Sequence, residues 1–556
     1  MERGFSRRIE ALAPYGQMSR EALMKGAGFT REQLDRPFIG VVNGYGEIGP
    51  GGIHLDRVAK AVKAGITAAG GTPVEFYVST TCVSMPHGGE NYRWTMPWRD
   101  IVASYIEATT EINYFDGLVM VTVCDDGIPA NLCAAARLGI PAIVMPGGCM
   151  RAAEWKGQHL DIVELTYKYG EVQSGRLSQE AFDQMHDCAV SGKGACGVMG
   201  TGNTGAVIAE ALGLALPGAG TVPGDSEEIM EIGRSSGEQI MTLVRKGITT
   251  REIMTQEALE NAIRVFLAAG GSTNQILHIA AIAYDAGLEL SIDTFDRLSR
   301  ETPFIVNCRP SGRYDISDLH DAGGVQAVMK ELSPLLNLDA LTVTGATVRD
   351  NLAKIQVSNR ELIYPLDRPL QHEGGIAALK GNLASDGAIV KQVAVPHSMM
   401  RFRGKARVYS SEPAATKALV SGEIRAGDVV VVNYQGPKGD PGMRQTGALF
   451  ANILVGMDLL DKVAFVTDGR LSGTNKGLLV AHVAPEAAVG GALAAVQDGD
   501  TIDIDVPGRR LSLLLPEKEI RRRLAECQPP PTVTRGFLAV YQRLVTQANE
   551  GCVLRP

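Results

Sequence analysis

The chain has 556 residues, of which 45% are hydrophobic, and its 54 basic and 62 acidic side chains give a net charge of −8. This length exceeds what one core can bury and predicts two or three domains. No basic run stands out, which argues against nucleic acid as a partner, and no run of about eighteen apolar residues is present to cross a membrane. Residues 1–16 lack the apolar stretch of a signal peptide, so a cytoplasmic protein is expected.

From about residue 38 to 345, short apolar runs alternate with helical patterns at spacings that fit βα units. The expected strands are residues 37–46, 74–83, 116–126 and 141–148. They are continuously apolar, as in a parallel sheet that is buried on both faces. Residues 54–71 indicate a helix that ends at glycine, and residues 248–271 a helix with Thr250 or Thr255 as its N-cap.

The residue pattern changes near residues 365–395, where a polar, turn-rich stretch precedes a part with many expected strands. Strands are expected at residues 406–410, 428–434, 462–469 and 500–506, with a helix at 412–422. The prediction is therefore an α/β protein. Its N-terminal domain, residues 1–370, has a mainly parallel sheet, and its C-terminal domain, residues 371–556, is β-rich and barrel-like with flanking helices.

Cys124, Asp125 and Asp126 follow one of the buried strands and precede a helix. In open α/β sheets, ligands gather at the carboxyl ends of the strands, so this loop is a candidate site. A thiolate is a soft metal ligand and a carboxylate a hard one. The nine cysteines are odd in number and dispersed, which does not fit a disulfide framework. Most of them are expected to be buried thiols, and a few to be metal ligands.

Several long loops carry a more specific signal when they are taken in chain order. They are GEIGPGGIHL (46–55), TCVSMPHGGENYRW (81–94), VCDDGIPA (123–130), GACGVMGTGNT (194–204), YQGPKGDPGM (434–443) and DGRLSGTNKG (468–477). This set resembles the dihydroxy-acid dehydratase / 6-phosphogluconate dehydratase family, which also contains sugar-acid dehydratases. The resemblance extends from about residue 38 to 510.

The resemblance implies a hydro-lyase that converts a 2,3-dihydroxy carboxylate into a 2-oxo-3-deoxy acid through an enol. Such chemistry needs a base for the C2 proton, a Lewis acid for the C3 hydroxyl, and a hard cation for the carboxylate and the C2 oxygen. The implied cofactors are an iron–sulfur cluster with one open iron, and Mg²⁺. The loop at Cys124 then serves both metals, because soft and hard ligands sort between them.

Residue by residue, the resemblance carries over in part. Cys124 and Cys196 match cluster cysteines, and Glu90 and Asp125 match magnesium ligands. Ser472 matches the serine that is proposed to act as the base in its alkoxide form. A free serine is a poor base at neutral pH, so it needs a nearby metal ion or a dry, positive site in order to ionise.

The cluster ligands depart from the commonest family pattern. Members with a [2Fe–2S] cluster have cysteine in the first loop, where this chain has Gly51. The 6-phosphogluconate dehydratase branch has cysteine at the position of Cys82. Cys82, Cys124 and Cys196 are therefore expected to bind three irons of a [4Fe–4S] cluster and to leave the fourth open. A [2Fe–2S] cluster stays open as an alternative, as does a reading in which Cys82 is only a buried thiol and no stable cluster forms.

The magnesium ligands depart as well. Asp126 replaces a lysine that is carbamylated in some members, and Gln435 replaces a glutamate. Both are expected to ligate Mg²⁺ through oxygen. Together, the two changes lower the negative charge of the site by about one unit, so weaker or different metal binding is predicted.

The substrate is expected to be a small hydroxy acid, and His87, Lys438 and Arg444 are candidates to contact it. Dihydroxy-acid dehydration in branched-chain amino-acid synthesis is the commonest activity that the resemblance implies. A sugar-acid (aldonate) dehydratase and a specialised dehydratase of a secondary pathway are alternatives. A cluster-free homologue that binds a polyol acid or a partner without catalysis is the alternative of another class. The family implies a homodimer or a homotetramer.

Overall fold

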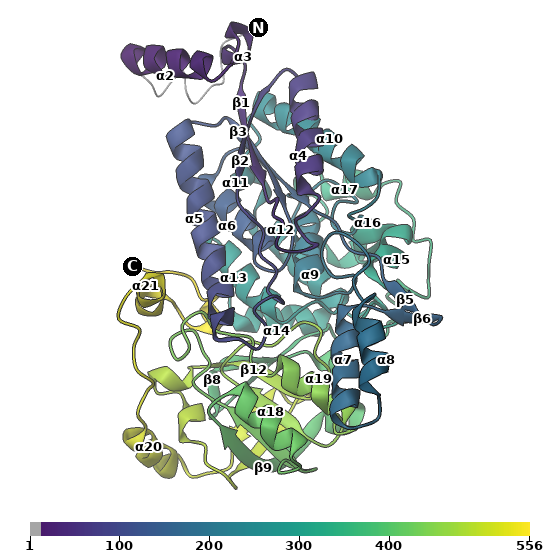
Figure 1. Ribbon diagram of the computed structural model, residues 1–556, viewed down its shortest axis with the longest axis vertical. Helices are drawn as coiled ribbons and strands as arrows, with labels where there is room; N and C mark the ends of the chain where they lie inside the picture. The colour runs from purple at the N-terminus through teal and green to yellow at the C-terminus, as the bar shows by residue number, and fades with distance from the viewer. Residues whose placement is uncertain (1–12) are drawn as a thin grey trace.

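The computed structural model describes residues 13–556, so the first twelve residues, on which the expected absence of a signal peptide partly rests, lie outside the described residues. Figure 1 shows an α/β part, coloured purple to teal, above a β-rich part, coloured green to yellow. This arrangement confirms the predicted fold class. Within residues 13–556, no helix combines the length and the apolar character that a bilayer span requires.

The sheet of the N-terminal part has four parallel strands in the order β2-β1-β3-β4. They are β1 (Phe38–Asn43), β2 (Thr72–Tyr77), β3 (Gly117–Thr122) and β4 (Ala142–Pro146). Every residue of β1, β3 and β4 is buried, which explains why these strands are continuously apolar in sequence. The four expected strands are thus confirmed, with shorter bounds.

Helices cover both faces of this sheet. The α4 helix (Leu55–Ala68) packs on α10 (Glu228–Lys246), and α5 (Thr95–Asn113) packs on α6 (Gly127–Leu138). Figure 1 shows the two pairs on opposite sides of the strands. Helices α4 and α5 bury their apolar faces against the sheet, so the sheet and its helices share one continuous core.

After β4 the chain departs from the expected βα alternation, because it adds only the short hairpin β5 (Ala153–Trp155) and β6 (Gln158–Leu160) and is otherwise helical up to residue 352. The further helices of this part are α2 (Pro14–Gly26), α3 (Arg31–Leu34), α7 (Ile162–Gln173), α8 (Gln179–His186), α9 (Thr201–Ala211), α11 (Thr250–Ile253), α12 (Gln256–Ala268), α13 (Asn274–Ala286), α14 (Ile292–Glu301), α15 (Ile316–Asp321), α16 (Gly324–Glu331) and α17 (Val348–Leu352). The expected helix at 248–271 is two helices, since Thr255 leaves the helical conformation and caps α12 through its Oγ, which accepts from Ala258 N at 3.3 Å.

The C-terminal part is a closed barrel of eight strands in the order β10-β11-β12-β8-β7-β14-β13-β9. The strands are β7 (Ala377–Gly381), β8 (Ala384–Val390), β9 (Arg401–Tyr409), β10 (Asp428–Val432), β11 (Ala464–Thr467), β12 (Leu479–Ala484), β13 (Thr501–Asp505) and β14 (Arg510–Leu513). Inward-facing valine, leucine and isoleucine side chains fill its interior. Helices α18 (Glu412–Val420) and α19 (Ala448–Gly456) pack on its outside.

The end of the chain returns to the N-terminal part. After α20 (Glu517–Glu526) and α21 (Phe537–Leu544), the Arg99 guanidinium on α5 donates to the carbonyls of Gly551 at 3.0 Å and Cys552 at 2.8 Å. Arg99 is fully buried. The tail therefore fastens the barrel part to α5, and it helps to hold the loops of the two parts in register.

Candidate active site

Loops from both parts of the chain surround one small cavity of about 90 Å³. Six of the expected site residues line it: Cys82, His87, Cys124, Asp125, Cys196 and Ser472. The first four follow β2 and β3, at the carboxyl ends of parallel strands. Ser472 comes from the loop after β11 of the barrel. The cavity thus lies between the two parts.

The three cysteines differ in their surroundings. Cys124 has a φ of 68°, in the left-handed region that residues other than glycine rarely adopt. Its thiol donates to the Cys82 sulfur, and this contact lowers the pKa of Cys82 to about 6 and raises the pKa of Cys124 well above its usual range. Burial raises the pKa of Cys196. Cys82 therefore ionises most readily, and binding of a metal would release protons from the other two.

Asp125 presents a buried carboxyl group to the cavity. Burial, with the negative charges of Asp126 and Cys82, raises the pKa of Asp125 to about 8, although the Arg470 guanidinium acts in the opposite direction. A carboxyl that is held protonated by neighbouring negative charges would ionise if a cation bound beside it. Asp125 therefore has the surroundings of a cation ligand.

Ser472 is held by its own loop. Its hydroxyl is hydrogen-bonded to the Thr474 hydroxyl at 2.8 Å, and its backbone N–H donates to Asn475 Oδ1 at 2.9 Å. The neighbouring Gly473 lies so close to Ser272 that a Cβ on the glycine would be 2.3 Å from the serine Cβ. The loop thus packs tightly against the N-terminal part, and this contact determines the position of the Ser472 hydroxyl at the cavity.

Three other expected metal ligands do not line this cavity. Glu90 is exposed at the start of the 3₁₀ helix Glu90–Trp94. Gln435 is buried, and its amide donates to the carbonyls of Ser410 at 3.3 Å and Asn433 at 3.1 Å. Asp126 is fully buried, 3.5 Å from His278 Nε2. The structure therefore brings Asp125 together with the thiols, whereas Gln435 donates to backbone carbonyls and Asp126 lies beside His278.

The candidates for substrate contact divide in the same way. His87 lines the cavity, and its ring lies 5.6 Å from the ring of Tyr92. Arg444 donates from Nε to Asp440 Oδ2 at 2.5 Å, and the backbone N–H of Lys438 donates to both carboxylate oxygens of Glu486 at 3.0 Å. Neither Lys438 nor Arg444 lines the cavity, so His87 is the candidate of the three that faces it.

Comparisons with known proteins give the family. The family model described as "Dihydroxy-acid/6-phosphogluconate dehydratase N-terminal" matches residues 36–351, and the corresponding C-terminal model matches residues 361–552. The chain belongs to this family. Relatives named "Dihydroxy-acid dehydratase" include that of Methanothrix thermoacetophila, which is 47% identical over 541 residues, covering 96% of this chain and 97% of the relative. Those of Methanococcoides burtonii and Pyrococcus abyssi are each 44% identical with the same coverage.

Membership in the dehydratase family confirms the resemblance that the loops indicated, and it makes the chain an enzyme of the hydro-lyase class. The family's two models join between residues 351 and 361, in the segment that precedes the first barrel strand at Ala377.

The thiols of this dehydratase fit one of the two implied cofactors, the iron–sulfur cluster. Three thiols face one cavity, and thiolates are the ligands of iron–sulfur clusters. Among the described residues, the one set of three metal-ligating side chains whose ligand atoms all lie within 4.8 Å of one another is His159, Asp161 and Asp315. The three sulfurs are thus too widely spaced to share a single ion, and a cluster of several irons suits them better.

Gly51 also fits this interpretation. A Cβ at Gly51 would lie 2.6 Å from Cys124 Sγ, so the backbone of the 46–55 loop touches the thiol. The position where [2Fe–2S] members carry cysteine is therefore at the edge of the same cavity. In this chain the Cys124 sulfur occupies the space that a side chain at residue 51 would need, and Cys82 approaches Cys124 from another loop.

Two buried cations beside the serine loop were not among the expected site residues. Lys391 follows β8, and its Nζ donates to the Gly473 carbonyl at 2.8 Å. Burial lowers the pKa of Lys391 to about 7. Arg470, two residues before Ser472, is fully buried. The motif DGRLSGT was a signal for Arg470, whereas a single lysine at the end of an apolar run gave no signal for Lys391.

The set of His159, Asp161 and Asp315 does not line the cavity, and its members contact protein groups. His159 Nε2 is 3.0 Å from both carboxylate oxygens of Asp315 and 3.6 Å from Asp161 Oδ2. Arg309 Nε is 3.6 Å from Asp315 Oδ1, and Asp161 caps α7 by accepting from Val163 N. These contacts describe an ion-pair network that joins the hairpin β5–β6 to the segment before α15.

Proposed function

We propose that this dehydratase removes water from a 2,3-dihydroxy carboxylate and releases a 2-oxo-3-deoxy acid. The observation that supports this reaction most strongly is that Cys82, Cys124, Cys196, Asp125 and Ser472, drawn from both parts of the chain, line one cavity. A non-catalytic binding protein would have no need to combine three thiols, a carboxyl and a serine hydroxyl. The names of the relatives point to the same chemistry.

Cys82, Cys124 and Cys196 would hold the iron–sulfur cluster, preferably [4Fe–4S], and Asp125 would hold Mg²⁺. Glu90, which does not line the cavity, is included as a further ligand on the resemblance alone. When bound, the cluster supplies the Lewis acid for the leaving C3 hydroxide, and Mg²⁺ supplies the hard cation for the carboxylate and the C2 oxygen. The N-terminus of α9 also faces the cavity through Thr201, Gly202 and Asn203. Its positive end favours an anionic substrate group.

Ser472 is the proposed base. Its Oγ accepts the proton from C2, the C2–H and C3–O bonds break, and an enol forms that tautomerises to the 2-oxo acid. The Thr474 hydroxyl is hydrogen-bonded to Ser472 Oγ at 2.8 Å and can donate to the alkoxide. Lys391 and Arg470 bring positive charge to the back of the same loop. Both effects stabilise the ionised serine in a water-poor site.

The wall of the cavity favours a small aliphatic acid over a phosphorylated sugar acid. Ile162, Val163 and Val198 supply apolar surface, and no lysine or arginine is among the described residues that line the cavity. A phosphate group brings nearly two negative charges and is usually bound by arginine or lysine. The polar residues Thr166, Asn203 and Asn452 keep an aldonate as the second candidate. We therefore place a branched dihydroxy acid first.

The test is an anaerobic preparation of the whole chain, analysed for iron and acid-labile sulfide and then assayed for 2-oxo acid. Three substrates are compared: 2,3-dihydroxy-3-methylbutanoate, gluconate and 6-phosphogluconate. We expect iron, sulfide and turnover of the first. Turnover of gluconate alone would move the assignment to the sugar-acid dehydratases, and an iron-free protein that is inactive on all three would refute the proposal.

Ser472→Ala tests the base separately. We expect loss of turnover with unchanged iron and sulfide content, whereas the control Ser385→Ala, at an exposed serine in β8, should leave both unchanged. If Ser472→Ala keeps its turnover, the serine is not the base.

A further inference from the structure

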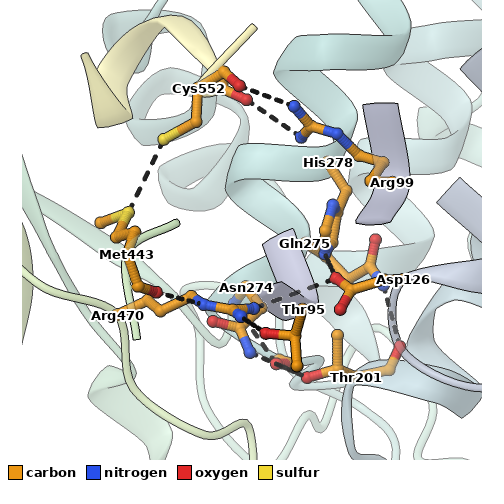
Figure 2. Close-up of polar contacts among 12 residues, drawn as sticks. Thr95, Arg99, Asp126, Thr201, Asn274, Gln275, His278, Met443, Arg470 and Cys552 are labelled. Carbon is orange, nitrogen blue, oxygen red and sulfur yellow. Dashed lines mark hydrogen bonds and ion pairs between the residues drawn. The ribbon is translucent and has the colours of Figure 1, made fainter. Parts of the chain in front are cut away.

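Asp126 follows Asp125 directly, yet it is absent from the lining of the cavity that the thiols face. Asp126 is fully buried and does not line the cavity. No described residue donates a hydrogen bond to either of its carboxylate oxygens. Its charged neighbour is Arg470, whose Nη1 lies 3.9 Å from Asp126 Oδ1 (Figure 2). His278 Nε2 is closer, at 3.5 Å from Asp126 Oδ1, but neither ring nitrogen of His278 makes a hydrogen bond with a described residue.

Arg470 links the serine loop to the N-terminal part. Its Nε donates to the Met443 carbonyl at 2.7 Å, its Nη2 donates to the Thr95 hydroxyl at the start of α5, and its Nη1 faces Asp126 (Figure 2). Its guanidinium also lies 5.8 Å from the centre of the Tyr92 ring. Arg470 therefore reaches from the loop that carries Ser472 to the starts of both α5 and α6.

A fully buried guanidinium needs a counter-charge, because an unpaired buried cation is strongly destabilising. Asp126 is the one carboxylate within 4.0 Å of Arg470 in the described part of the chain. It stands at the N-cap of α6, where the helix dipole also favours a negative charge. A divalent cation bound to Asp126 would have to lie close to the guanidinium, and in a buried site this repulsion is large.

We propose that Asp126 is the counter-ion of Arg470 and a positioning residue for the Ser472 loop, and that it is not a ligand of the divalent cation. The aspartate thus takes over a structural task at a position where the resemblance implies a metal ligand. The part that concerns Ser472 rests on the proposed function. The part that concerns the cation does not require turnover.

The first experiment compares Asp126→Asn with its neighbour Asp125→Asn, which serves as the matched control. Both are prepared anaerobically as the cluster-loaded full chain, and binding of Mn²⁺, used in place of Mg²⁺, is measured by electron paramagnetic resonance of the free ion. We expect the Mn²⁺ dissociation constant of Asp125→Asn to rise at least tenfold and that of Asp126→Asn to stay within twofold of the parent. An equal loss in both variants would overturn the proposal.

The second experiment tests the pair and its effect on the loop with Asp126→Asn, Arg470→Met and the double variant. We expect each single variant to have a lower Tm than the parent. The Tm of the double variant should be no lower than that of the less stable single variant, because the double variant leaves no unpaired charge. At a temperature where all the proteins are folded, kcat should be at least tenfold lower than in the parent and about equal in the three variants. The KM of each variant should stay within twofold of the parent value. Additive losses of Tm, or an unchanged kcat in Asp126→Asn, would overturn the proposal.

Discussion

Replacing Gly473 by alanine is the sharpest test of how the serine loop is held. The new Cβ would lie 2.3 Å from Ser272 Cβ and 2.4 Å from Ser272 Oγ. Carbon atoms in contact stay about 3.5–4.0 Å apart, so the loop has to move by roughly 1 Å. Overpacking of this kind costs about 1–3 kcal/mol of stability. Because Ser472 is the adjacent residue, a displacement of about 1 Å should lower kcat by roughly 10²-fold.

The assay measures kcat from the release of 2-oxo acid, together with iron content and thermal unfolding. Gly26→Ala is the control, because nothing lies within 4 Å of the Cβ that it adds, and it should match the parent. Gly473→Ala combined with Ser272→Gly removes the two closest atoms and leaves only Ser272 Cα, at 2.9 Å, so it should recover part of the activity. The reasoning fails if Gly473→Ala alone keeps kcat within twofold of the parent.

Three further predictions concern neighbouring positions. Gly51→Ala should lower the iron content per chain, because its Cβ would lie 2.6 Å from Cys124 Sγ, whereas Gly49→Ala, with 3.9 Å to Cys82 Cβ, should not. Burial lowers the pKa of Lys391 to about 7, so the parent carries a buried positive charge below that pH and loses it above. Lys391→Met should therefore have a higher Tm than the parent at pH 6, and this difference in Tm should shrink as the pH rises to 9. A difference that grows with pH would contradict this. Gln435→Glu should lower the free energy of unfolding by about 2 kcal/mol in denaturant titration, since it sets a carboxylate against the Ser410 and Asn433 carbonyls; an unchanged stability with tighter Mg²⁺ binding would instead restore Gln435 as a ligand.

The parts of the fold that the sequence predicted are those in which burial leaves a continuous apolar pattern. The strands β1, β3 and β4 are buried along their whole length, and their bounds follow from that pattern. In the barrel, β8 (Ala384–Val390) has an exposed serine and aspartate as its second and third residues and then a glycine at φ 112°, so it resembles a turn in sequence. Its pairing with β7 and β12 comes from barrel closure, which a local pattern does not contain.

The site shows a similar division. Cys124, Asp125 and Ser472 are carried by motifs, and the structure places all three on one cavity. The direction of Asp126 was not predictable from the motif, because it depends on the left-handed backbone at Cys124 and on the start of α6 three residues later. Gln435 likewise faces backbone carbonyls of its own domain. Identity of residue type along a loop fixes which ligands are present, but not the direction in which each one points.

The distribution of charge around the cavity connects these findings. The Asp125 carboxyl and three thiols face it from the N-terminal part, so cations are favoured on that side. Two buried basic side chains, Arg470 and Lys391, lie beside the serine loop on the other side. Fields are strong in a buried site, so this arrangement favours metal ions near Asp125 and an ionised oxygen at Ser472. The substrate would then lie between the two, with its carboxylate toward the metals and its C2 proton toward the serine. In the proposed arrangement, Asp126 balances the charge of Arg470, so that this buried cation does not weaken the metal site proposed at Asp125.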